Sequence, residues 1–146
     1  MADVHSPKTR SFNMSRIRSK DTKPEEIVRK YLFSKGFRYR KNDARFPGKP
    51  DIVLPKYKTV IFVNGCFWHK HEGCRYFSWP ENNAEFWAKK INANVERDAK
   101  NYAHLQQLGW HVIVIWECDL KANHRTITLL RLIEELEDYY TKDHKG

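Results

Sequence analysis

The feature that most constrains the fold is a long helical segment placed between two apolar runs. Residues 59–63 (TVIFV) have the composition of a strand, and residues 84–108 carry apolar side chains at spacings of three, four or seven. Residues 111–116 (HVIVIW) form a nearly continuous apolar run, which predicts a strand buried on both faces. Because a strand, a helix and a second strand are joined by a right-handed crossover, the two strands are expected to be parallel neighbours. The sequence therefore predicts an α/β fold in which helices flank a mixed sheet.

Two further helices are predicted on either side of this unit. Residues 22–25 (TKPE) have the form of a capping box, with Thr22 as N-cap and Glu25 as its partner, and Gly36 ends that helix. The other helix is expected near residues 126–140, with a loose charged tail after it. The apolar stripes of the three helices consist of Ile27, Val28, Tyr31 and Leu32, then Trp87, Ile91, Val95, Tyr102 and Leu105, and finally Ile127, Leu130, Ile133 and Leu136.

A hairpin precedes the long helix and ends in a loop. Residues 37–40 alternate as a strand does, and Asp51 opens a short apolar run that leads through a turn at residues 55–58 into the strand 59–63. That strand is expected to end at Asn64, and the following residues, to about residue 80, fit neither helical nor strand periodicity. The hairpin therefore holds an isolated carboxylate near a loop rich in cysteine, histidine and aromatic residues.

Length and composition predict a cytoplasmic protein of one domain. A chain of 146 residues is the usual size of a single domain, here residues 1–146, with an N-terminal arm at 1–21 and a core at 22–140. Three cysteines are too few for a disulfide framework. Neither a signal peptide nor a membrane-spanning apolar run is found, so no membrane partner is expected.

The positive charge is concentrated in the first third of the chain. The net charge is +9, and residues 1–50 contain 14 Lys and Arg against 5 Asp and Glu, whereas residues 51–146 contain 13 of each. Such asymmetry is typical of a protein that neutralises nucleic-acid phosphates, although a merely soluble basic surface is the alternative. The candidate phosphate contacts in the arm are Arg10, Arg16, Arg18 and Lys20.

The three cysteines and one histidine have the composition of a metal site. Cys66, His71 and Cys74 lie within nine residues, and Cys118 follows the buried strand. A Cys3His set is a closed tetrahedral site suited to structural zinc, which would staple a loop without secondary structure. The alternative is that Cys66 and Cys118 are ordinary buried thiols and that His71 lies on the surface.

A second group has the residue types needed for phosphodiester hydrolysis. Such a reaction needs a carboxylate to hold a hard cation against the phosphate and a group that takes a proton from water. Asp51 and His69 fit these two roles; Glu25 and Asp98 belong to the same group, and Asn64 lies near the first two. Each has a plainer explanation: Asp51 as a turn acid, Glu25 as a cap, Asp98 on a charged helix face and His69 as a further zinc ligand.

Aromatic residues are abundant in and after the same loop. Phe67 and Trp68 lie in it, and Trp87 lies near the start of the long helix. Aromatic side chains in a polar loop can stack on bases or insert between them. Core packing is the alternative for Trp87, because its spacing is helical.

These motifs together resemble the very short patch repair endonucleases, bacterial enzymes that nick DNA at a T:G mismatch left by deaminated 5-methylcytosine. The resemblance covers nearly the whole chain, in the order and spacing typical of the family. The matching segments are TKPE (22–25), FPGKPD (46–51), VIFVNGCFWH (60–69), NVERD (94–98), LGW (108–110) and VIWEC (114–118).

The resemblance implies a restriction-endonuclease-like fold and a set of residue roles. It implies magnesium at Asp51 and the backbone carbonyl of Val63, with His69 as general base or water-orienting group and Glu25 and Asp98 as supports. It further implies insertion of Phe67, Trp68 and Trp87 beside the mismatch, and an arm that lies along the DNA. It also implies structural zinc on Cys66, His71, Cys74 and Cys118.

This chain departs from familiar members of the family at two neighbouring positions. Val63 and Asn64 stand where threonine and histidine are usual, and one residue is inserted in the segment 71–74. An amide can bind water but cannot carry its proton, so the role of base shifts to His69. The expected function is a magnesium-dependent mismatch-nicking endonuclease acting as a monomer. The alternatives are a restriction or homing-type nuclease with another target, and a zinc-stapled DNA-binding module that does not cut.

Overall fold

The structure, a computed structural model, describes the backbone of residues 22–145 and the side chains up to Lys142. The expected basic arm at residues 1–21, with Arg10, Arg16, Arg18 and Lys20, lies outside the described residues. Within the described part, no helix has the length and apolar character needed to cross a membrane.

Four strands form one mixed sheet, as the sequence predicts. The strands are β1 (Arg40–Lys41), β2 (Ile52–Leu54), β3 (Thr59–Asn64) and β4 (His111–Trp116), and their order in the sheet is β1-β2-β3-β4. The first three strands pair antiparallel, whereas β3 and β4 pair parallel over their whole length. The predicted parallel pair around the long helix is therefore confirmed.

The turn of the hairpin is a short 3-10 helix. It spans Pro55–Tyr57 and is followed by Lys58 in the left-handed region, at φ 51°. This compact connection reverses the chain between β2 and β3 and fixes their register, with Ile52 opposite Ile61. The register keeps Asp51 close to the carboxyl end of β3.

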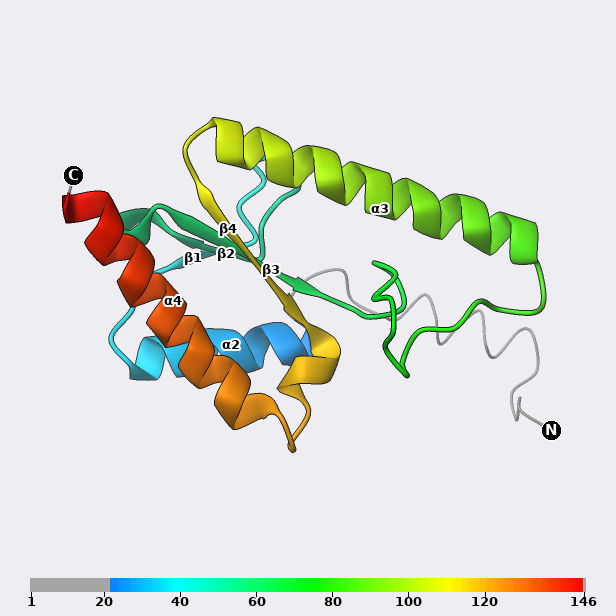
Figure 1. The fold of residues 1–146 in the computed structure, drawn as a ribbon, viewed down its shortest axis with the longest axis horizontal. Coiled ribbons are helices and arrows are strands. Elements are labelled where there is room, and N and C mark those ends of the chain that lie inside the picture. Colours follow the sequence, from blue (N-terminus) through cyan, green and yellow to red (C-terminus); the bar gives the residue numbers. More distant parts are fainter. Residues whose placement is uncertain (1–21, 146) are drawn as a thin grey trace.

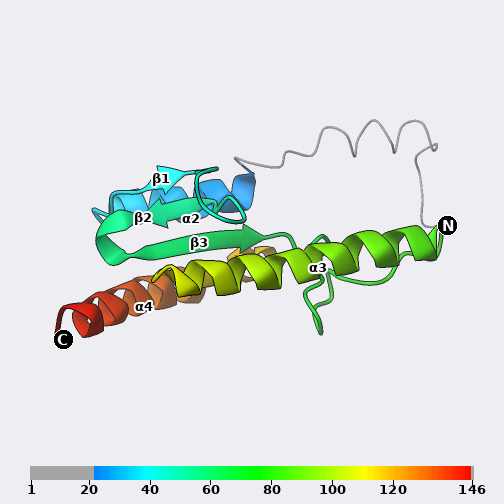
Figure 2. The same cartoon turned by 90° about the horizontal axis from the view of Figure 1, so that it is seen from above.

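Helices cover both faces of the sheet (Figure 1). Helices α2 (Lys23–Ser34) and α4 (Arg125–Lys145) lie on one face, and α3 (Ala84–Gln107) lies on the other, which Figure 2 shows from above. The alternation of strand side chains divides the core accordingly. Ile52, Ile61 and Ile113 pack among residues of α2 and α4, whereas Val60 and Phe62 pack with Leu105 of α3.

The long helix α3 follows its predicted bounds closely. It is capped at Leu108, and Gly109 has φ +91°, the conformation expected of a glycine just past a helix end. Ile91 and Leu105 are fully buried, and truncation of such a leucine to alanine costs about 2–5 kcal/mol of stability. Val95, predicted on the buried stripe, is 37% exposed, because the covered face of the helix runs through Ile91, Asn94 and Asp98 and Val95 lies beside it.

Three other predictions about helices and strands are wrong in detail. Only Arg40–Lys41 forms the first strand, not residues 37–40, because Phe37 instead turns into the core of α2 and α4. In β4 only Ile113 and Ile115 are buried, so the strand is half-buried on its α3 face. The last helix does not end near residue 140 but continues to Lys145.

The buried stripe of α4 also differs from the predicted one. Leu129, Leu132 and Leu136 are buried, whereas Ile127 and Leu130 are 56% and 52% exposed. Both sets of residues are spaced three or four apart, so helical periodicity alone does not distinguish them.

Candidate active site

A cleft of about 660 Å³ opens where β3 and β4 end. Its walls come from α2, β3, α3 and the loop after β3, and they carry most of the polar residues singled out in the sequence. The residues important for its chemistry are Glu25, Asp51, Asn64, His69 and Asp98, with Trp68 at the rim. Segments far apart in the chain therefore converge at the carboxyl ends of the two parallel strands.

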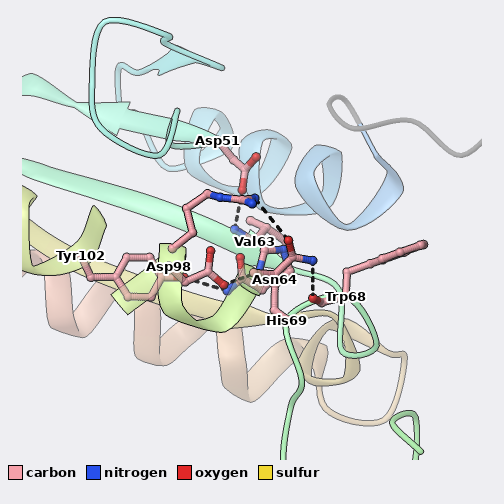
Figure 3. A network of polar contacts seen from close by, with 9 residues as sticks. Asp51, Val63, Asn64, Trp68, His69, Asp98 and Tyr102 are labelled. Atoms are coloured by element: carbon pink, nitrogen blue, oxygen red, sulfur yellow. Dashed lines mark hydrogen bonds and ion pairs between the residues drawn. The ribbon is translucent and has the colours of Figure 1, made fainter. Parts of the chain in front are cut away.

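Asp51 is fixed against the end of β3 (Figure 3). The backbone N–H of Val63 donates a hydrogen bond to Asp51 Oδ2 at 2.6 Å. Asp51 precedes β2, and the antiparallel register of β2 with β3 brings the two residues together. Because one carboxylate oxygen is committed to Val63, the other is available for a cation or a proton.

A second carboxyl group lies against Asp51. Glu25, only 2% exposed, projects from α2 and forms an ion pair with Arg29 at 3.4 Å. Burial raises the pKa of Asp51 to about 7, the Val63 N–H opposes this rise, and the neighbouring Glu25 adds to it. Two adjacent carboxyl groups, Glu25 buried and Asp51 half-buried, favour a shared proton or a bound cation, and paired oxygen ligands suit a hard cation such as magnesium.

The capping box predicted at the start of α2 is not formed. Thr22 occupies the N-cap position, but its side chain makes no capping hydrogen bond. Glu25 is directed into the cleft instead, where it shares a hydrogen bond with Asp51. The plainer explanation of Glu25 as a cap is therefore wrong, and Glu25 lines the cleft.

His69 and Asp98 form a short hydrogen-bonded pair on the wall formed by α3. His69 Nδ1 lies 2.6 Å from Asp98 Oδ2. An ionised carboxylate can only accept, so the proton of a neutral imidazole resides on Nδ1 and the lone pair on Nε2 is available to the cleft. His69 is placed to accept a proton from a molecule in the cleft, and it is not part of the cysteine cluster.

Asn64 is held in the same way by another residue of α3. Its side-chain Nδ2 donates to the hydroxyl of Tyr102 at 2.9 Å, and Asn64 is only 4% exposed. Burial raises the pKa of Tyr102 to about 12, so this hydroxyl keeps its proton at neutral pH. Asn94 lies one turn before Asp98 on α3, and its Nδ2 donates to the carbonyl oxygen of Trp68 at 3.1 Å.

The three cysteines and His71 come together as predicted. Their ligand atoms all lie within 4.8 Å of one another, and this is the one group of three or more metal-ligating side chains found among the described residues. Cys118, at the start of a 3-10 helix (Glu117–Leu120) after β4, contributes from 47 residues away and places its Sγ 3.4 Å from His71 Nδ1. The cluster joins the loop after β3 to the end of β4.

The geometry of this cluster fits a tetrahedral ion. With metal–sulfur and metal–nitrogen bonds of about 2.3 and 2.05 Å, a tetrahedral S···N edge is about 3.6 Å, close to the observed separation. The ring of Trp116 stacks on His71 at 4.1 Å and fixes its orientation. Gly73 has φ +75°, so the inserted segment closes back on the cluster through a conformation that glycine adopts without strain.

The thiols of the cluster differ in their acidity without an ion. Burial raises the pKa of Cys66, and it raises that of Cys118 to about 12 with a contribution from the other two cysteines. The backbone N–H of Tyr76 lowers the pKa of Cys74. Because like charges repel, a cation would be needed to hold all three cysteines as thiolates.

The aromatic residues singled out in the sequence form one cluster beside the cleft. The ring of Phe67 lies 5.2 Å from that of Trp68 and 5.5 Å from that of Trp87, and the two tryptophans are 5.7 Å apart. Trp87 therefore packs on the loop residues and not on the sheet core. In this aromatic cluster of Phe67, Trp68 and Trp87, the first two residues line the cleft and Trp87 packs against them.

Several residues of the site were not identified from the sequence. Tyr102 was assigned to the core, and Phe77, Trp79 and Phe86, which extend the aromatic cluster, were not singled out. Lys49 and Arg97 line the cleft and place two cations there. The lysine follows Gly48 and the arginine lies within the segment 94–98, but nothing in their spacing indicates which way they point.

A mixed sheet flanked by helices, with an acidic and histidine-containing cleft at its strand ends, defines the restriction-endonuclease-like class of proteins. Comparison with protein families matches residues 2–75 to the DNA mismatch endonuclease Vsr. The chain belongs to this family, and it is a DNA endonuclease.

Relatives cover almost the whole chain. A type II nicking enzyme of Neisseria meningitidis is 52% identical over 94% of this chain and 99% of its own length. The DNA mismatch endonuclease Vsr of Escherichia coli is 45% identical over 95% of this chain and 88% of its own length. A type II nicking enzyme of Xanthomonas oryzae is 46% identical over 82% of this chain and 88% of its own length.

Proposed function

We propose that this chain is a magnesium-dependent endonuclease that nicks one DNA strand on the 5′ side of the mispaired thymine in a T:G mismatch. The observation that carries the proposal is the meeting, in one cleft, of the Asp51–Glu25 carboxyl pair with the His69–Asp98 pair. The first is suited to hold a cation against a phosphate and the second to take a proton from water.

The reaction is hydrolysis of one phosphodiester bond. His69 Nε2 accepts a proton from the attacking water, the water oxygen bonds to phosphorus, and the bond from phosphorus to the leaving deoxyribose oxygen breaks. Asp98 holds the imidazole in the required tautomer and stabilises its protonated form. Lys49 and Arg97 add positive charge near the phosphate.

The magnesium ligands proposed are the second carboxylate oxygen of Asp51 and the backbone carbonyl of Val63, with Glu25 supporting a bound water. A cation there would supply positive charge to the scissile phosphate and to the leaving oxygen. The raised pKa of Asp51 beside Glu25 supports this assignment, because a cation bound there would favour the ionised form of Asp51.

The second metal proposed is structural zinc on Cys66, His71, Cys74 and Cys118. Three thiolates and an imidazole leave no open position for a substrate, which is the arrangement of a structural and not a catalytic site. Two of its ligands, Cys66 and His71, lie on either side of His69 in the chain, so zinc would stabilise the loop that presents the proposed base.

Recognition of the mismatch is proposed to depend on the aromatic cluster. A wobble pair is easier to unstack than a matched pair, so Phe67, Trp68 and Trp87 can insert beside it at a smaller cost of DNA deformation. The basic arm, with Arg10, Arg16, Arg18 and Lys20, would lie along the backbone and neutralise phosphates.

The biological setting is proposed from the same assignment. The enzyme is proposed to act as a monomer and as one domain over residues 1–146. We further propose that it works in the bacterial cytoplasm, on the nucleoid, and that it is linked in function to a cytosine-5 DNA methyltransferase. Deaminated 5-methylcytosine is the source of the T:G pairs that it would repair.

A panel of duplexes tests the proposed target. Each duplex carries one mismatch or none, in several sequence contexts, and is incubated with the full chain in magnesium and in a chelator. We expect a single nick in the T:G duplex, little cutting of the matched duplex and no cutting without a divalent metal.

The relatives named as type II nicking enzymes support a second candidate, a nuclease of the same fold with a sequence-specific target. Equal cutting of matched and mismatched duplexes would favour that candidate over mismatch repair. Binding without cutting in magnesium would favour the third candidate, the DNA-binding module, for which the replacement of histidine by Asn64 is the motivating feature.

A further inference from the structure

One face of α3 makes a regular series of hydrogen bonds to the cleft. Asn94, Asp98 and Tyr102 lie at intervals of four residues, which places them on the same side of the helix. Asn94 binds the carbonyl of Trp68, Asp98 binds His69, and Tyr102 binds Asn64. The proposed function gives roles to His69 and Asp98, but Tyr102 has none.

Tyr102 is held firmly where it meets Asn64. Its ring lies 4.9 Å from that of Phe62, in the cluster of buried residues that includes Leu105. Phe62 and Asn64 lie two residues apart on β3 and point to the same face of the sheet. The helix and the strand therefore fix both partners of the hydrogen bond, and the side chain of Asn64 has little freedom.

The hydrogen bond between Asn64 and Tyr102 also determines which atom of the Asn64 amide can bind a molecule in the cleft. The amide nitrogen is committed to Tyr102, and the amide oxygen diverges from it by about 120° at the planar carbon. Asn64 lines the same cleft as Asp51 and His69. With the nitrogen held on the α3 side, Oδ1 is left as a hydrogen-bond acceptor for a molecule in the cleft.

We propose that Tyr102 is a positioning residue that locks the Asn64 amide, so that Oδ1 accepts a hydrogen bond from the attacking water while His69 removes its proton. This inference rests on the proposed function. The water has two protons: one passes to His69 Nε2, and the other is directed to Asn64 Oδ1, which orients the oxygen lone pair toward phosphorus. Asn64 itself gains and loses no proton.

Tyr102→Phe tests the inference, because it removes only the hydroxyl and keeps the ring against Phe62. We expect the single-turnover nicking rate on a T:G duplex to fall about tenfold, with the dissociation constant for that duplex unchanged. Tyr139→Phe is the matched control: Tyr139 stacks on His111, away from the cleft, and this variant should nick at the wild-type rate.

The double variant Tyr102→Phe with Asn64→Ala separates positioning from packing. If Tyr102 acts through Asn64, the double variant nicks no more slowly than Asn64→Ala alone. The inference would be overturned if the rate reductions of the two single variants multiplied in the double variant. It would also be overturned if Tyr102→Phe nicked at the full wild-type rate.

A second readout does not depend on nicking. The side-chain amide protons of Asn64 should exchange slowly with solvent in the wild-type chain and at least about tenfold faster in Tyr102→Phe, as measured by NMR. Unchanged exchange would overturn the positioning contact. If the wild-type chain nicks no duplex, the proposed function and the proposed role of Asn64 toward water are both overturned. The amide exchange would still show in that case whether Tyr102 holds Asn64.

Discussion

His69 and Asp98 are 29 residues apart in the chain, yet His69 Nδ1 lies 2.6 Å from Asp98 Oδ2. The loop after β3 supplies the imidazole and the middle of α3 supplies the carboxylate. The position of His69 relative to Asp51 therefore depends on how α3 packs on the sheet, not on the loop alone. Substitutions at this pair and around it give direct tests of the proposed mechanism.

We expect His69→Ala to lower the nicking rate by about 10²–10⁴-fold, more than Asn64→Ala does. Imidazole can accept a proton near neutral pH and an amide cannot, so the two losses should differ. Single-turnover nicking of a T:G duplex measures both, with the exposed His104→Ala on α3 as control. A larger loss from Asn64→Ala would assign the base to another group.

Asp51→Asn should abolish nicking while binding of the T:G duplex is retained, because the substitution removes the proposed anionic ligand of magnesium and leaves the aromatic cluster intact. A filter-binding or anisotropy titration measures binding beside the nicking assay. Asp138→Asn, on the exposed part of α4, should change neither quantity. Nicking by Asp51→Asn in magnesium at the wild-type rate would contradict the assignment.

The same substitution should raise the stability of the metal-free chain at high pH. The folded chain holds the Asp51 proton up to about pH 7, whereas an unfolded aspartate releases it near 3.8. Unfolding therefore releases a proton between these values, so stability falls as the pH rises from about 4 to 7 and stays low above 7. Asparagine does not ionise, so in a chelator the Asp51→Asn variant should unfold at a higher temperature than the wild-type chain at pH 8. This difference in unfolding temperature should disappear near pH 4. An equal rise in unfolding temperature at both pH values would contradict the raised pKa of Asp51.

Cys118→Ser should lower zinc content and thermal stability together. Metal analysis of the wild-type chain should give about one zinc per chain, and removal of one thiolate opens the tetrahedral set. Prolonged treatment of the wild-type chain with a chelator should reproduce the loss of stability. A variant that is stable, free of zinc and active would exclude the structural role of the cluster.

Trp87→Ala should reduce discrimination between T:G and matched duplexes. The ring packs against Phe67 and Trp68, so its removal weakens the proposed insertion beside the mismatch. The ratio of nicking rates on the two duplexes measures the effect. Phe33→Ala, which removes an exposed aromatic ring on α2, should leave that ratio unchanged.

Removal of residues 1–20 should weaken binding to every duplex and reduce its salt dependence. Each lost phosphate contact lowers the slope of log affinity against log salt by about 0.9. A chain with alanine at Arg10, Arg16, Arg18 and Lys20 should lose about as much DNA affinity as the truncated chain, because the contribution of the arm is proposed to be electrostatic. An unchanged slope in both would show that the arm does not contact DNA.

The strands, the long helix and the metal ligands were predictable because each depends on a local pattern. Alternation and apolar runs located β2, β3 and β4, and the spacing of Cys66, His71 and Cys74 indicated a cluster that Cys118 could complete. The parallel pairing of β3 and β4 followed from the helix between them.

The errors arise where two patterns fit the same residues, or where the partner lies far along the chain. Glu25 satisfied the pattern of a capping box, so its burial against Asp51 could not be inferred from the spacing. Ile127 and Leu130 form as regular a stripe as the leucines that α4 buries. Tyr102 was assigned to the core correctly, but its bond to Asn64 spans 38 residues and depends on the rotation of α3 about its axis.

The spacing of Asn94, Asp98 and Tyr102 also determines where the chain can change its length. Insertion or deletion of one residue between these positions would rotate the following part of α3 by about 100° and move its side chains along by 1.5 Å. Such a change would separate at least one partner from the cleft. A residue added between Gly73 and Asn83 lies outside any helix or strand and alters no bond of this series. We therefore expect a one-residue insertion to preserve nicking in the loop between Gly73 and Asn83 and to abolish it in α3 between Asn94 and Tyr102.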